Sequence, residues 1–438
     1  MMVLREKSYH LQPDILVKLA LSLSRAQMPI PSSTILRLML EKGMLPPMNV
    51  LQLLFLHMVK TEVGACIASN LLIQICDNYV QFCSGKSPCA NLLKPDTVIF
   101  NLVLDACVRF GSSLKGQQII ELMSQTEVVA DGHSIIIIAQ IHEINGQRDE
   151  LKKFKDHVAP LPVAFVSHYR QFYECLLSLH FKFDDIDAAA ELLLDMNRSR
   201  GSHPMDDPGK DFQKPRFVPI GSQNLRNGLK IQIMPELIHK DSALKEEGRS
   251  PLSIKEASSI YQPSLSKCLV EEVSDAEKAV SHIIYELNSS IYFFSKAKMM
   301  GDALNIYRRM QEMKVQPTEH TFMYLVCGYS SLEMYRDITI LWGDMKRIME
   351  TGSLTLSSDL YEFLLLNFLR GGYFERVMEA IGYMNKCNMY VDKWMYKSEY
   401  LKIHKNLYRS LKASKARTEA QGKRLEHVKA FKKWAGIN

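Results

Sequence analysis

The sequence repeats itself with a period of thirty-five residues, and this period constrains the fold more than any other feature. Asp96 precedes an apolar segment, 97–103, and Asp131 precedes a second apolar segment thirty-five positions later. Gly111 and Gly146 recur at the same interval. A period of about 20 to 50 residues is typical of chains built as arrays of small structural units. We therefore predict a stack of repeats.

Each unit carries the pattern of two amphipathic helices. In the unit 97–131, apolar side chains recur at helical spacing in two groups, namely Phe100, Val103, Leu104 and Cys107, then Ile119, Ile120 and Met123. Gly111 lies between the groups, where the first helix must end. Helices this short are marginal alone, so the hairpins must stack. We expect an all-α chain, an α-α superhelix (solenoid) of about eight helix-turn-helix hairpins with a disordered internal insertion.

A second register supports the repeat independently of the turns. In five units a methionine near the end of the second helix has a basic residue fourteen positions before it. The pairs are Arg25 with Met39, Arg109 with Met123, Lys182 with Met196, Lys296 with Met310, and Arg370 with Met384. In a sixth unit, Ser331 stands at that distance before Met345. Chance does not produce this recurrence when only 54 of 438 residues are Lys or Arg.

The repeat resembles the pentatricopeptide repeat (PPR) family of plant organelles, P-type. The residues that carry the resemblance are Asp96-Thr97-Val98-Ile99-Phe100-Asn101, Ile284-Tyr285-Glu286-Leu287-Asn288, and the helix end from Met310 to Pro317. The units 97–131, 284–318 and 358–392 match best, 15–47, 132–165, 166–201 and 319–357 match less well, 48–96 carries an insertion, and a half-unit starts at Lys393. The resemblance implies a protein that binds single-stranded RNA, an organellar transcript, in RNA processing, stability or translation.

An alternative within the same architecture stays open. Tetratricopeptide repeats have a period of about 34 residues and bind peptides, which would make the chain a scaffold for protein partners. Their tryptophan and Leu-Gly pattern is missing here, and the period is thirty-five in the clean units. The sequence therefore favours RNA.

The periodicity divides the chain into four parts. We expect N-terminal repeats over 15–198, a disordered linker or insertion over 199–275, C-terminal repeats over 276–412, and a basic C-terminal tail over 413–438. The evidence for the insertion is the loss of helical spacing together with recurrent prolines.

The resemblance also implies which side chains read bases. In each unit they are the residue after the aromatic position of the first helix and the last residue of the unit. The pairs are Asn101 with Asp131, Asn288 with Thr318, and Glu362 with Asp392. Short polar side chains can supply donors and acceptors to a base edge. The local alternative is that Asp131 only caps the next helix. Ile136, Arg170 and Met323 occupy the first position elsewhere, so we expect few bases to be read.

A ladder of cations ends the first helices. Arg25, Arg109, Lys182, Lys296 and Arg370 would form one row in a stack of hairpins, and such a row suits RNA phosphates. The alternative is a local interaction of each cation with the helix macrodipole.

The sequence contains no pattern for catalysis, metal or cofactor binding. The nine cysteines lack the spacing of a zinc knuckle, and we expect them to be reduced and mostly buried. The segment Ser84-Gly85-Lys86-Ser87 resembles a phosphate-binding loop, but Val80 stands where that motif needs glycine. A deaminase signature is also missing. We therefore expect no enzyme activity, no metal and no cofactor.

Composition and the start of the chain bear on membrane binding and location. The net charge of +6 is mild, and no uninterrupted apolar run is long enough to cross a bilayer, so no membrane partner is expected. By resemblance the location is the mitochondrion or the chloroplast, with the mitochondrion as first choice. No transit peptide is visible, and we expect the sequence to be N-terminally truncated.

Overall fold

The computed structural model describes residues 12–84, 93–158, 166–201, 216–219, 228–231, 275–413 and 418–437. Over these ranges the chain forms nineteen helices and two short strands. The first ten helices are α2 (Pro13–Arg25), α3 (Pro29–Glu41), α4 (Met48–Met58), α5 (Glu62–Ser84), α6 (Thr97–Arg109), α7 (Ser113–Gln125), α8 (Gly132–Ile144), α9 (Arg148–Val158), α10 (Val166–Lys182) and α11 (Ile186–Gly201). The others are α14 (Asp275–Lys296), α15 (Met300–Glu312), α16 (Glu319–Ser331), α17 (Tyr335–Glu350), α18 (Ser358–Gly371), α19 (Phe374–Lys386), α20 (Lys393–His404), α21 (Leu407–Ala413) and α22 (Glu419–Trp434).

The helices pair into hairpins, as the repeat predicts. From α2/α3 to α10/α11 there are five successive pairs, which we call the N-terminal array, and α14/α15 to α18/α19 add three more in the part of the chain that the structure describes. The hairpins from α14 onward, with α20 to α22, are the C-terminal array. Within an array each first helix packs on the next first helix, as α6 does on α8 and α14 on α16. The predicted α-solenoid is confirmed.

Left-handed residues end the helices at the turns. Gly111 has φ +69°, and the next amide, of Ser112, donates to the Cys107 carbonyl over 2.8 Å. This bond closes the end of α6 as in a Schellman motif. Several other turns place a side chain in the same conformation, for example Lys298 with φ +62°. The predicted helix end at Gly111 is confirmed.

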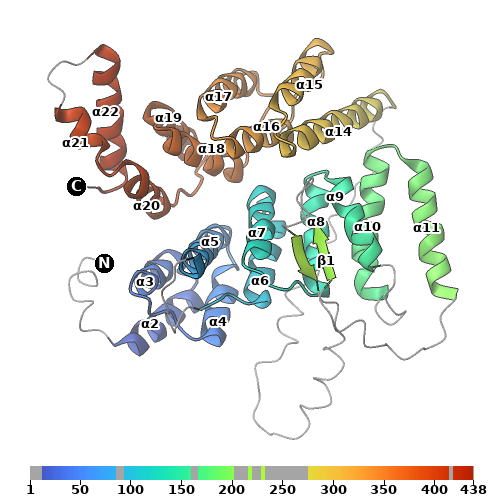
Figure 1. Cartoon of the computed structure of the whole chain (residues 1–438), viewed down its shortest axis with the longest axis horizontal. Coiled ribbons are helices and arrows are strands. Elements are labelled where there is room, and N and C mark those ends of the chain that lie inside the picture. Colours follow the sequence, from blue (N-terminus) through green and yellow to red (C-terminus); the bar gives the residue numbers. More distant parts are fainter. Residues whose placement is uncertain are drawn as a thin grey trace, which may run out of the picture.

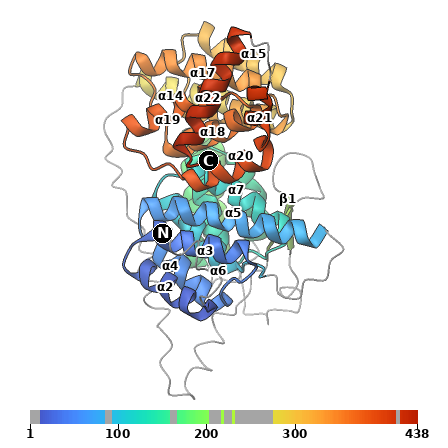
Figure 2. The ribbon, with the colours of Figure 1, turned by 90° about the vertical axis from the view of Figure 1, so that its left-hand side faces the viewer.

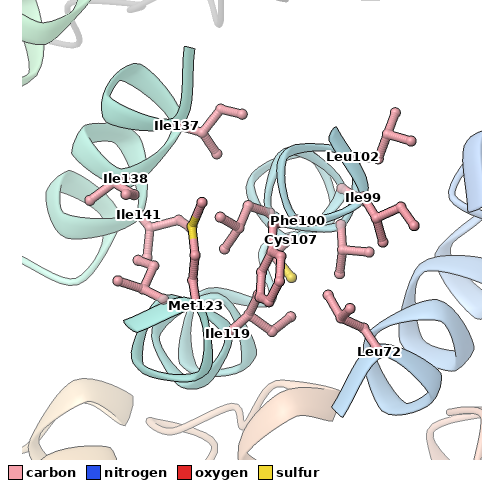
Figure 3. Packing of buried hydrophobic residues seen from close by; sticks show 14 of the residues in the cluster. Leu72, Ile99, Phe100, Leu102, Cys107, Ile119, Met123, Ile137, Ile138 and Ile141 are labelled. Carbon is pink, nitrogen blue, oxygen red and sulfur yellow. The ribbon is translucent and has the colours of Figure 1, made fainter. Parts of the chain in front are cut away.

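The recurring methionines pack inside the hairpins. Figure 3 shows Met123 of α7 between α6 and α8, near Phe100 and Ile141. Met39, Met123, Met310, Met345 and Met384 are all buried, and Met196 is half-buried. The recurring spacing therefore follows from a shared packing site at the end of each second helix.

The two arrays lie one upon the other. In Figure 1 the second helices α3, α5 and α7 of the N-terminal array face the first helices α18 and α20 of the C-terminal array. Figure 2 shows the same order from the side, with α5 and α7 beneath α18 and α20. Each array has its own cluster of buried apolar side chains. Leu114 of α7 and Tyr285 of α14 cross between the clusters.

Part of the predicted insertion is ordered, which corrects the expectation for twelve residues. Residues 199–201 end α11, residue 275 begins α14, and eight residues form two strands. Strands β1 (Arg216–Pro219) and β2 (Gly228–Ile231) form an antiparallel pair with Val218 opposite Leu229. Val218, Leu229 and Ile231 are fully buried in the N-terminal core, and the Ala130 amide donates to the Lys230 carbonyl over 2.8 Å. The apolar face of the strands thus covers α7 and α9. Residues 202–215, 220–227 and 232–274 lie outside the described part of the chain.

The predicted C-terminal tail is also corrected where the structure describes it. Residues 419–434 form α22, whose N-terminus is closed by a capping box between Thr418 and Gln421. Phe431 is fully buried, with its ring centroid 5.7 Å from that of Phe374 in α19 and 5.4 Å from that of Tyr400 in α20. The basic side chains of α22 therefore surround an apolar stripe that closes the end of the array.

Among the described helices, one has the length and composition of a membrane span. It is Glu62–Gln81 within α5, with a mean hydropathy of 1.2. More than half of this segment is buried, and α5 packs against α3, α4, α6 and α7. This is the environment of a core helix in an array.

Candidate functional site

The first predicted pair meets in the structure. The Asn101 side-chain amide in α6 donates to Asp131 Oδ1 over 3.1 Å. Asp131 is exposed and caps α8, since the Ser134 amide donates to the same oxygen over 2.8 Å. The Ser134 hydroxyl in turn donates to Asn101 Oδ1 over 2.7 Å. A carboxylate only accepts, so these bonds fix which way the amide points. Asp131 therefore combines the predicted pairing with the local capping role.

The second predicted pair repeats this geometry. Asn288 of α14 donates to Thr318 Oγ1 over 3.0 Å, and Thr321 Oγ1 donates to Asn288 Oδ1 over 2.7 Å. Thr318 caps α16, and the Thr318 amide donates to Thr321 Oγ1 over 3.0 Å. Two units far apart in sequence thus hold the asparagine amide between the cap residue and a hydroxyl three positions further on.

A third pair was missed from the sequence. Gln52 of α4 donates to Asp96 Oδ2 over 2.5 Å, and Asp96 caps α6 by accepting from the Ile99 amide over 3.1 Å. Gln52 is the fifth residue of α4, as Asn101 is the fifth residue of α6. The insertion in 48–96 hides the pair by breaking the constant spacing. Counting from the start of the helix would have found it.

The third predicted pair, Glu362 with Asp392, is held differently. Both are buried, and each is bound to the N-terminal array. Asp392 accepts two bonds from Arg37 of α3, over 3.1 and 2.6 Å, while the Arg37 guanidinium lies 4.5 Å from the ring centroid of Trp394. Glu362 Oε2 lies 3.2 Å from Lys115 Nζ of α7.

These contacts belong to one buried polar network, which we call the charged seam. Its members are Arg37, Asn70, Lys115, Asp359, Glu362 and Asp392, all buried. Asn70 of α5 joins the two ion pairs, since its Nδ2 donates to Asp392 over 3.1 Å and its Oδ1 accepts from Lys115 over 3.0 Å. The Lys115 backbone amide donates to Asp359 Oδ2 over 3.0 Å.

Burial and charge shape the titration of the charged seam. Burial raises the pKa of Asp359 to about 6, although the Lys115 ammonium opposes the shift. Burial alone would lower the pKa of Lys115, but the Glu362 and Asp359 carboxylates raise it above its ordinary value. Lys115 is thus the cation on which two carboxylates of α18 converge.

The basic ladder divides into two groups. Arg25, at the end of α2, is exposed, and Arg109, at the end of α6, is paired with Asp105 over 2.8 Å. Arg109 Nη2 also donates to the Val59 carbonyl over 3.3 Å, beside the exposed Lys60 after α4. Burial, followed by the charges of Lys60 and Arg25, lowers the pKa of His57. Cations therefore lie at the ends of α2, α4 and α6. Lys60 was not predicted, because no methionine follows it at fourteen positions.

The other three ladder residues, like Arg109, are paired with carboxylates. Lys182 lies 3.8 Å from Glu143, and Arg370 lies 2.8 Å from Glu399. Lys296 of α14 reaches across to Glu121 of α7 over 2.7 Å. Arg370 lines a cleft of about 1290 Å³ beside the charged seam, between α3, α5 and α7 on one side and α18 and α20 on the other.

Cysteine side chains lie in both arrays. Cys66, Cys76, Cys107, Cys175, Cys327 and Cys387 are free thiols. Burial raises the pKa of Cys107 and of Cys327, each to about 12. Across the described ranges, no group of three or more His, Cys, Asp and Glu side chains is arranged to hold a metal ion.

Comparison with known proteins places this geometry in a family. No protein-family model matches the sequence. A pentatricopeptide repeat-containing protein of Arabidopsis thaliana is 42% identical over an alignment that covers 100% of this chain and 83% of that protein. A second Arabidopsis relative, named as mitochondrial, is 23% identical, with 98% of this chain and 79% of that protein covered.

Solved structures of the maize pentatricopeptide repeat protein PPR10 are also similar. The free protein is 11% identical, with a TM-score of 0.26 and coverage of 99% of this chain and 66% of that chain. Its complex with an 18-nt psaJ RNA element is 14% identical, with a TM-score of 0.26 and coverage of 93% and 49%. Scores this low identify no common overall shape. The full-length identity to the first Arabidopsis relative is decisive, and the chain belongs to the pentatricopeptide repeat family.

Proposed function

We propose that this protein binds single-stranded RNA on the first-helix face of its N-terminal array. Gln52 with Asp96 and Asn101 with Asp131 would read two successive bases, one on each of the neighbouring units 48–96 and 97–131. The observation that carries the proposal is the recurrence of one amide-to-cap geometry in both units. An amide and a carboxylate together offer donors and acceptors to a base edge.

The cations beside these pairs suit the RNA backbone. Arg25, Lys60 and Arg109 lie at the ends of the same three first helices that carry or flank the pairs. Such contacts position the strand without reading its sequence. Membership in the family points to the same ligand class.

Binding to four RNAs that differ at one base tests the proposal. Replacing Asn101 and Asp131 by Ala should cost on the order of 1 kcal/mol, mainly for one base, which we expect to be uracil more often than cytosine. Replacing Arg109 by Ala should weaken all four RNAs about equally and lower the salt slope by roughly one unit.

Arg170→Ala changes an exposed cation of α10, paired with Glu174, and should leave the base preference of the unit 97–131 intact. Equal losses across all four RNAs for the Asn101 and Asp131 variant would refute base reading. Binding of a peptide instead of RNA would favour the protein-scaffold alternative.

The proposal extends to the setting of the activity. We propose an organellar role in RNA processing, stability or translation, because relatives are named as mitochondrial or chloroplastic. We also propose that the protein acts by binding alone. RNA recovered from the binding assays with Mg²⁺ should then have unchanged length and base identity.

A further inference from the structure

The first helices of the two arrays differ in what covers them. In the C-terminal array, α14, α16, α18 and the start of α20 lie against the N-terminal array along its second helices and one loop. The contacts are Lys296 to Glu121, the Tyr324 hydroxyl donating to the Asn145 carbonyl, Lys115 to Glu362, and Arg37 to Asp392. The first helices of the C-terminal array are therefore covered at these contacts, and in the unit 358–392 the predicted base-reading pair itself, Glu362 and Asp392, is occupied.

The chemistry of this contact is that of a separable interface. Most of each apolar cluster lies within one array, with Leu114 and Tyr285 as crossing members. The six buried polar side chains of the charged seam join the two arrays. Buried ion pairs add little net stability, because desolvation offsets the attraction, yet removing one partner leaves an uncompensated charge. The open cleft of about 1290 Å³ beside the charged seam leaves part of the contact accessible to water. Polar interfaces between compact parts of a chain permit relative motion.

We propose that the charged seam holds a closed state in which the second helices of the N-terminal array compete with RNA for the first-helix face of the C-terminal array. This inference rests on the proposed function. In the closed state only the N-terminal array is open to RNA, and Glu362 and Asp392 act as docking residues. Opening would free the units from 284 onward, so RNA that spans both arrays would bind the open state selectively.

Lys115→Met and Arg37→Met test the proposal, because both change second-helix residues outside the proposed RNA face. Methionine keeps an unbranched chain at each position but leaves the facing carboxylates buried without a cation. The contact between the arrays should therefore open before either array unfolds. We expect a larger radius of gyration by small-angle X-ray scattering, with unchanged helical content by circular dichroism. Arg308→Met, which changes an exposed cation of α15, is the matched control and should scatter like the parent protein.

Two oligouridylate probes separate the possible results. A strand of about six nucleotides can occupy only a few units, whereas one of about twenty can reach both arrays. The opened variants should bind the long strand at least about threefold more tightly than the parent does and the short strand equally well. An unchanged radius of gyration in both variants overturns the closed state. Opening without a gain for the long strand overturns the competition.

A charge-exchange variant distinguishes opening of the arrays from loss of folding. The double variant Arg37→Asp with Asp392→Arg again places opposite charges at these two positions. It should have the radius of gyration of the parent protein. Such a recovery would show that Arg37→Met acts through the lost ion pair and not through unfolding. If the parent protein binds neither strand, the proposed function is wrong, while the scattering result still decides whether the charged seam closes the chain.

Discussion

At the residue scale, the turns show how backbone conformation selects side chains. Gly111 and Lys298 both adopt positive φ at the end of a first helix, +69° and +62°. Only glycine adopts this conformation without steric cost. A Cβ at Gly111 would meet no atom within 4 Å, so strain in the backbone is the only penalty there. The two positions therefore allow glycine and lysine to be compared in the same type of turn.

Exchanging the residue types should move stability in opposite directions. Gly111→Ala should lower the free energy of unfolding by about 1 kcal/mol. Lys298→Gly should raise it by about 0.5 kcal/mol, since relief of strain exceeds the added freedom of the unfolded chain. Lys18→Gly, at an exposed position inside α2, should cost about 1 kcal/mol and serves as the control. Urea denaturation measures all three, and stabilisation by the Lys18 change would contradict the explanation.

His142 predicts a dependence of stability on pH. It is buried, its Nδ1 lies 2.7 Å from Gln147 Oε1, and burial lowers its pKa below 6.5. Below about pH 6.5 the unfolded chain therefore binds a proton that the folded chain excludes. The stability contributed by neutral His142 is present above that pH and is lost as the pH falls.

The variant His142→Asn should lose part of this dependence. Between pH 7 and 5.5 its free energy of unfolding should fall less than that of the parent protein, even though its stability at pH 7 is lower. His427→Asn alters a half-buried histidine of α22 and should keep the parent slope. Equal slopes for all three proteins would show that His142 does not contribute.

At the element scale, the two short strands show how local patterns can hide order. β1 and β2 have four residues each and lie among prolines and glycines, so no helical period marks them. Their order comes from burial of Val218, Leu229 and Ile231 against α7 and α9. A strand pair this small is unstable alone and depends on the surface that it covers.

Leu229→Ala should therefore destabilise the N-terminal array. Loss of a fully buried leucine costs about 2 to 5 kcal/mol. Phe217→Ala is the matched control, because the Phe217 side chain is 42% exposed on the opposite face of the pair. Thermal denaturation should show a clear fall for the first variant and a small change for the second. The reverse order would mean that the strands do not pack as described.

At the scale of the whole molecule, the charged seam joins residues that are far apart in sequence. Arg37 and Asp392 are separated by 355 positions, and Asn70 and Asp392 by 322. A tertiary network of this kind can close a solenoid whose repeats otherwise contact only their neighbours. The same chain then has one first-helix face open and one covered, which is the basis for the proposed competition.

The sequence by itself determined the hairpins, the helix end at Gly111 and the pairing of Asn101 with Asp131. All of these depend on helical periodicity and on contacts within one repeat or between successive repeats. Gln52 was not predicted as a site residue because an insertion broke the repeat spacing. The helix α22 was not predicted because its many basic residues obscured two buried side chains, Val428 and Phe431.

Only the tertiary structure decided which surfaces are free. Glu362 and Asp392 occupy the same positions in their unit as Asn101 and Asp131 do in theirs, yet they lie buried against Lys115 and Arg37. The spacing within a repeat specifies which face of a helix a side chain occupies. It carries no information about which other repeat packs on that face, because that depends on how small rotations accumulate along the whole stack.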